Sequence, residues 1–98
     1  MPSIDGEATH PSVDIQQELR RRGWPREELA RRMGGDTMLN LYALDSYLET
    51  GPTRPEMPLR EDLARQLGYA FGTPAEIWLQ RHAAWQSCET NERLNAIR

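Results

Sequence analysis

Glycine and proline residues divide most of this chain into short segments, and each segment repeats its apolar residues at helical spacing. The clearest break lies between Phe71 and Ile77. There Gly72 ends one helix, Thr73 serves as the N-cap of the next, Pro74 takes its first position and Glu76 completes a capping box. The sequence shows no convincing alternation typical of strands. It therefore predicts an all-α fold.

The same breaks predict five helices within one domain, which suits a chain of 98 residues. Ser12 is the expected N-cap of the first helix and Gly23 its expected end, and Asp36 or Thr37 is expected to cap the third helix. Gly68 inside the fourth would let another helix pack closely. We expect a flexible N-terminal arm over residues 1–11, a domain over 12–86 and a polar C-terminal tail over 87–98. The expected helices span about 13–22, 25–33, 37–49, 59–71 and 74–86.

Charge is unevenly distributed along the chain. All 12 basic residues are arginine and the net charge is −3, yet residues 12–34 carry +2 and residues 35–62 carry −4. The arginines reflect either coding bias in a GC-rich genome or recognition of phosphate or carboxylate groups. The single cysteine, the polar N-terminus and the lack of a long apolar run predict a cytoplasmic protein without a membrane span.

Two motifs carry a resemblance to a known family. Residues 19–24 (LRRRGW) and 26–34 (REELARRMG) look like the first two helices of lambda-repressor-like (XRE) helix-turn-helix domains. Residues 70–79 (AFGTPAEIWL), with AAW at 83–85 and His10-Pro11 near the start, are similar to the HigA-type antitoxin branch. The resemblance covers residues 10–86.

This resemblance implies a five-helix DNA-binding fold that is usually dimeric. In the antitoxin branch it also implies binding to a small toxin and repression of the toxin's own operon. The arginines of the first two helices would clamp phosphates and the third helix would read bases in the major groove. These arginines are Arg20, Arg21, Arg22, Arg26, Arg31 and Arg32. Solvated pairs such as Glu27–Arg31 and Glu28–Arg32 are the alternative for those arginines. The candidate DNA-binding residues are Arg26, Arg31, Arg32, Thr37, Asn40, Tyr42 and Ser46.

The third helix departs from the family pattern because it is apolar and acidic. If its leucines at 41, 44 and 48 face the core, the opposite face is formed by Leu39, Tyr42, Ala43 and Ser46 and is still mostly apolar. Base reading normally uses Arg, Lys, Asn or Gln. Asp45 and Glu49 would repel phosphates. A helix that is apolar all round is usually buried, in a core or under a partner. The candidate protein-interface residues are Leu39, Ala43, Tyr47, Trp78 and Trp85. For Trp78 and Trp85 a place in the core is the alternative, and we expect it for one of the two.

Catalytic and metal sites are not expected. His10, His82 and Cys88 fit no zinc-binding spacing, His10 falls in the predicted arm, and His82 is expected at the surface or at an interface. The sequence contains no nucleophile–base pair, carboxylate dyad or glycine-rich phosphate loop. We therefore expect no enzyme activity, no cofactor and no metal.

Two functions remain open at this stage. The first is a dimeric DNA-binding regulator resembling HigA-type antitoxins. The second is a module derived from the same fold that has lost base reading and binds a protein, such as a toxin, a phage factor or a host factor.

Overall fold

The computed structural model describes the backbone of residues 9–97 and the side chains of residues 9–89. This part of the chain is helical and contains no strand, which confirms the all-α prediction. None of its helices is long and apolar enough to cross a membrane. The elements are α1 (Pro11–Arg22), α2 (Arg26–Arg32), α3 (Thr37–Glu49), the 3₁₀ turn η1 (Gly51–Thr53), α4 (Glu61–Phe71) and α5 (Ala75–Ile97).

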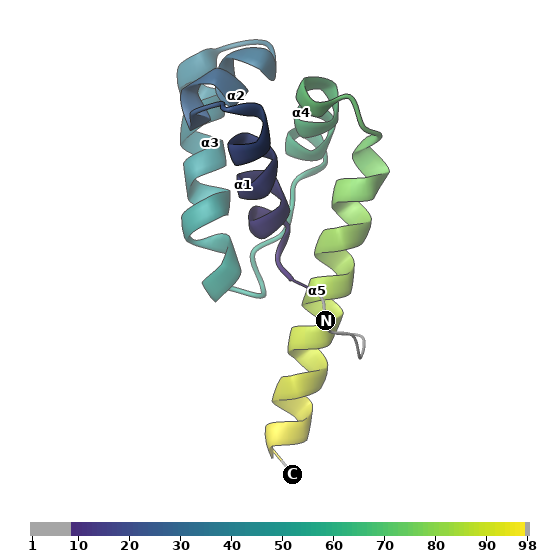
Figure 1. The fold of residues 1–98 in the computed structure, drawn as a ribbon. Coiled ribbons are helices and arrows are strands. Elements are labelled where there is room, and N and C mark those ends of the chain that lie inside the picture. Colours follow the sequence, from purple (N-terminus) through teal and green to yellow (C-terminus); the bar gives the residue numbers. More distant parts are fainter. Residues whose placement is uncertain (1–8, 98) are drawn as a thin grey trace.

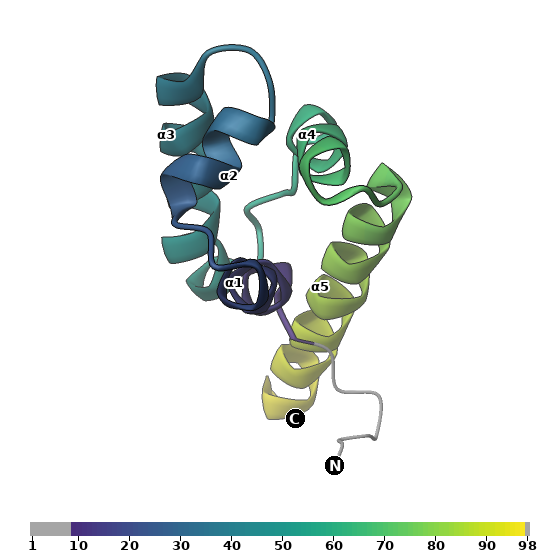
Figure 2. The same ribbon diagram turned by 45° about the horizontal axis from the view of Figure 1, so that its top comes forward.

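The helices form two groups on either side of α1. Figure 1 shows α2 and α3 on one side and α4 and α5 on the other, and the rotated view in Figure 2 keeps α1 between the two groups. Side chains from all five helices meet in a single core. Its members are Ile15, Leu19, Leu29, Met33, Leu44, Tyr47, Leu48, Leu59, Leu63, Ala64, Leu67, Phe71 and Trp78.

Helix α1 begins earlier than expected because a histidine caps it. The Nδ1 atom of His10 accepts a hydrogen bond from the backbone N–H of Ser12 at 3.0 Å, so His10 occupies the N-cap position. The prediction that Ser12 is the cap is therefore wrong. His10 is also only 4% exposed, which contradicts its assignment to a flexible arm. Residues 1–8 of that arm lie outside the described residues.

A four-residue connection joins α2 to α3. Gly34 and Gly35 both have positive φ angles, of 84° and 79°, a backbone conformation that costs residues with a Cβ atom more than glycine. The carboxylate of Asp36 then accepts a hydrogen bond from the N–H of Leu39 at 3.1 Å and caps α3, as the sequence predicts. The connection is thus short and fixed at both ends.

The boundary between α4 and α5 agrees with the sequence in position and differs in detail. Gly72 ends α4 in the left-handed conformation, and a Cβ atom added to Gly68 would lie 2.3 Å from the carbonyl oxygen of Thr73, which explains the glycine there. Helix α5 begins at Ala75, later than expected. Thr73 Oγ1 accepts a hydrogen bond from the Trp78 indole at 3.0 Å.

Helix α5 is longer than predicted. We expected the helical chain to fray after Gln86, but its backbone continues as a helix to Ile97. The lower half of α5 extends beyond the other helices (Figure 1). The polar segment from residue 87 to residue 97 is therefore helical in this structure.

Candidate interaction surface

Helix α3 has one buried face and one strongly exposed apolar face. Its buried face consists of Asn40, Leu44, Tyr47 and Leu48. On the other side the side chains of Met38, Leu39 and Tyr42 are 73%, 68% and 78% exposed. Ala43 and Thr37 are exposed as well, and Ser46 is half-buried. The expected outward position of Leu39, Tyr42 and Ala43 is therefore confirmed.

Helix α4 extends this apolar surface across a groove. Its Tyr69 is 77% exposed. Between the two helices lies a hollow of about 350 Å³, whose apolar wall includes Tyr42, Ala43 and Leu63. A second hollow of about 540 Å³ adjoins it and reaches Met33 and Tyr69. Asp62 and Gln66 line both hollows, and the second lies between α4 and the segment Met33–Gly34 that follows α2. We call the exposed side chains of Met38, Leu39, Tyr42, Ala43 and Tyr69, together with this groove, the α3–α4 surface.

Asn40 is not available to read DNA bases. It is only 7% exposed, and its amide nitrogen donates to the carbonyl oxygens of Ala30 and Gly34 at 3.0 and 2.6 Å. Its amide oxygen accepts from Gln66 at 3.1 Å. These bonds tie α3 to α2, to the connection and to α4. The expected DNA contact is therefore wrong, because this amide satisfies buried backbone groups instead.

Arg26 is held by the acidic residues of α3. One of its guanidinium nitrogens donates to Asp45 at 2.8 Å and to Glu49 at 2.9 Å, and the side chain is 29% exposed. The hydrogen bond to Asp45 is the main reason that the pKa of Arg26 is raised above its ordinary value. Binding a phosphate would require Arg26 to give up these contacts.

The arginines at the end of α2 share one carboxylate. Arg31 and Arg32 bond to Glu28 at 2.5 and 2.6 Å, which lowers the pKa of that carboxyl. Of the two expected pairs, Glu28–Arg32 is present, whereas Arg31 pairs with Glu28 and not with Glu27. Arg32 also lies over the Trp24 ring, 4.3 Å from its centroid. Both guanidinium groups remain at the surface, with side chains 63% and 45% exposed.

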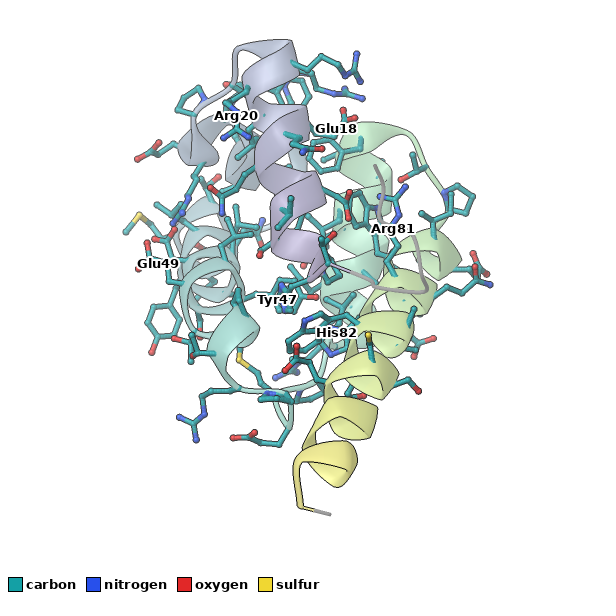
Figure 3. All side chains as sticks on the ribbon, turned by 60° about the horizontal axis from the view of Figure 1, so that its bottom comes forward. Glu18, Arg20, Tyr47, Glu49, Arg81 and His82 are labelled. Atoms are coloured by element: carbon teal, nitrogen blue, oxygen red, sulfur yellow. The ribbon has the colours of Figure 1, made fainter. Side chains whose placement is uncertain are left out.

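Three expected interface residues lie inside the chain. Tyr47, Trp78 and Trp85 are 1%, 2% and 5% exposed, so they leave almost no surface for a partner. Tyr47 and Trp78 belong to the hydrophobic core, and Trp85 packs against the rings of His10 and His82. Figure 3 shows Tyr47 facing His82 between α3 and α5, with Glu49 on the outer side of α3. The assignment of these three residues to an interface is therefore wrong.

A buried histidine cluster was missed at the sequence level. His82 is 5% exposed, and its Nδ1 atom shares a hydrogen bond of 2.8 Å with the hydroxyl of Tyr47. His10 packs with ring centroids 4.7 Å from Tyr47 and 4.6 Å from Trp85. Burial, and then the neighbouring His82, lower the pKa of His10 to about 4. The sequence did hold one signal, because His82 lies on the same helical face as Trp78 and Trp85.

The described residues include no group of three or more His, Cys, Asp or Glu side chains placed to hold a metal ion. The α3–α4 surface carries Met38, Leu39, Tyr42 and Tyr69, which are four of the five large exposed apolar side chains among the described residues. The chain matches no protein-family model, no curated protein and no solved structure among those compared with it.

Proposed function

We propose that this chain is a protein-interaction module whose α3–α4 surface contacts a partner protein. The observation that carries the proposal is the contrast between the two faces of α3. Asn40, the only side-chain amide on this helix, is buried, whereas the exposed face carries Met38, Leu39 and Tyr42. Exposed large apolar side chains that cluster on one face mark interaction sites more often than isolated ones do. Binding through such a face needs no base-reading side chain.

The shape of the α2–α3 pair supports an origin in a DNA-binding fold. Two helices joined by a short glycine-containing turn are the form of a helix-turn-helix, in which the second helix enters the major groove. In this chain that second helix would present methionine, leucine and tyrosine to the bases and Asp45 and Glu49 toward the phosphates. We therefore propose a lambda-repressor-like arrangement in which protein binding has replaced base reading.

Site-specific photo-crosslinking in the native host tests this function. A photoreactive phenylalanine analogue is placed at Tyr42, and at Val13 as a matched control, because Val13 is an exposed apolar residue on α1. We expect one discrete protein adduct at Tyr42 that is absent at Val13 and is lost when Leu39→Ser is added. Adducts of equal yield at both positions, or adducts to nucleic acid at Tyr42, would contradict the proposal.

A second candidate is the DNA-binding regulator with a HigA-type antitoxin role and a dimeric state. The observation in its favour is the basic edge formed by α1 and α2. Arg20 of α1 is exposed and forms no ion pair among the described residues, and Arg31 and Arg32 at the end of α2 are exposed as well. These groups would bind phosphates with little sequence preference. This candidate predicts binding to duplex DNA that weakens steeply with salt.

A further inference from the structure

The apolar part of the α3–α4 surface lies beside an acidic one on the same helix. Met38, Tyr42, Asp45 and Glu49 follow one another at spacings of three and four residues, so they form one stripe along α3. The first half of this stripe is apolar and the second half is anionic. A partner that covers the whole stripe must therefore match both characters.

The charge of α3 is one-sided. None of its residues from Thr37 to Glu49 is Lys or Arg, and Asp36 caps its N-terminus. The guanidinium of Arg26 faces both Asp45 and Glu49, so one positive charge is shared by two carboxylates. Glu49 also lies in the last turn, where the helix dipole favours a cation. The carboxylates at this end of α3 are unfavourable for the helix itself. Residues that conflict with local helix stability in this way are typical of functional sites, such as a site that binds a partner.

The other wall of the groove is close to neutral. On α4 the pairs Arg60–Asp62 and Arg65–Glu61 lie at 3.4 and 3.5 Å, so each carboxylate there has a cation beside it. The unbalanced charge of the α3–α4 surface therefore belongs to α3. Asp45 and Glu49 do not line the groove, which Tyr42, Ala43 and Ser46 line from the α3 side, and Tyr42 belongs both to the groove and to the stripe that contains the two carboxylates.

The acidic half of the α3 stripe and the symmetry of self-association disfavour three of the possible binding partners of the α3–α4 surface. Phosphate groups of nucleic acid or anionic lipid would meet the carboxylates of α3. A twofold dimer through this surface would bring the carboxylates of both copies into one interface without adding a cation to match them, which opposes binding. Contact with the basic α1–α2 edge of another copy would be head-to-tail, and such contacts form open chains unless the rotation closes a ring.

We infer that the α3–α4 groove binds an amphipathic helix of another protein, with an apolar stripe bordered by lysine or arginine. This inference rests on the proposed function and specifies its partner. The apolar stripe of that helix would cover Leu39, Tyr42 and Tyr69 and enter the groove, as helices do in other helix-in-groove complexes. Its cations would lie against Asp45 and Glu49 and give orientation and a faster encounter.

Two synthetic peptides of 18 residues test the inference on the full chain. Both carry the same leucine stripe at helical spacing, and the polar face is lysine in one and glutamate in the other. A third peptide has the composition of the lysine peptide with the leucines scrambled. Each is titrated into the isotope-labelled chain, and amide chemical shifts report both the affinity and the residues contacted. The Leu39→Ser and Tyr42→Ser variants are compared with Val13→Ser as the matched control.

We expect the lysine peptide to bind at the α3–α4 surface about tenfold more tightly than the glutamate and scrambled peptides. Leu39→Ser and Tyr42→Ser should weaken it by about tenfold, and Val13→Ser should not. Equal binding of the two leucine-striped peptides at this surface would overturn the charge inference and leave the proposed function standing. Shifts confined to other surfaces, or no binding by any peptide, would overturn the inference, whereas the crosslinking result decides the proposed function separately.

Self-association is a separate outcome. If sedimentation shows that the unlabelled chain forms a dimer that Leu39→Ser dissociates and Val13→Ser does not, a second copy covers this surface. That result would overturn the inference of a different, basic partner. A monomer, or a dimer insensitive to Leu39→Ser, agrees with the inference, because the surface then remains open to another protein.

Discussion

Protonation of His10 should destabilise this fold as the pH falls. The ring lies between Tyr47, His82 and Trp85, its Nδ1 atom accepts from the Ser12 N–H, and its buried Nε2 atom has no hydrogen-bond partner among residues 9–89. Burial favours the neutral ring and lowers its pKa from 6.5 to about 4. At 1.36 kcal/mol per pKa unit, this shift is linked to about 3 kcal/mol of folding stability.

The sign of the effect follows from proton binding. Between pH 6.5 and about 4 the unfolded chain binds a proton at His10 that the folded chain does not bind. The stabilisation by the neutral ring is therefore complete above the unfolded pKa, is lost as the pH falls through this window, and changes no further below about pH 4. Burial also lowers the pKa of His82, so its contribution has the same sign.

Urea unfolding followed by tryptophan fluorescence measures this effect. We compare the wild-type chain with His10→Asn, which keeps an N-cap side chain and removes the titrating ring. The variant loses ring packing at every pH. The wild-type advantage in unfolding free energy should therefore shrink by about 3 kcal/mol from about pH 7.5 to about pH 4. An advantage that stays constant over this range, or an NMR titration that places the pKa of His10 at 6.5 or above, would refute the reasoning.

The same unfolding assay tests three further substitutions. Gly68→Ala should destabilise the fold by about 1–3 kcal/mol, because the new Cβ would meet the Thr73 carbonyl oxygen; unchanged or increased stability would contradict this. Asn40→Ala should cost about 2–4 kcal/mol, because it leaves the buried carbonyl of Ala30, the partly buried carbonyl of Gly34 and the Gln66 amide without their partner; a loss below about 1 kcal/mol would mean that water replaces the amide. Leu39→Ser should change stability by less than about 0.5 kcal/mol, since Leu39 is exposed; a larger loss would assign it to the core.

The sequence predicted the helices well because the signals that start and end them are local. Gly23, Gly72 and the Asp36 cap each act within a few residues of their own position, so their effect can be predicted without the fold. The first helix starts two residues early because the ring of His10 serves as a cap. Histidine is not among the usual capping residues, so the pattern gave no reason to expect it.

The candidate site was only partly predictable because exposure depends on the packing of distant segments. The outward face of α3 follows from the positions of its leucines, and Leu39 and Tyr42 were placed correctly on it. Asn40 is buried because the carbonyl groups of Ala30 and Gly34 lie beside it in the folded chain. The burial of Trp85 depends on His10, which is 75 residues away in sequence. Neither contact leaves a periodic trace in the sequence.

The most direct test of the central claim is whether the exposed face of α3 contacts DNA. The isotope-labelled chain is titrated at low salt with duplex DNA from its own upstream region and with a scrambled duplex of equal length. Amide shifts of residues 37–43 are followed. We predict that these amides do not move with either duplex, and that any weak shifts lie in α1 and α2, are the same for both duplexes and disappear as salt is added. Shifts of residues 37–43 that occur only with the native duplex would contradict the account and restore the base-reading function.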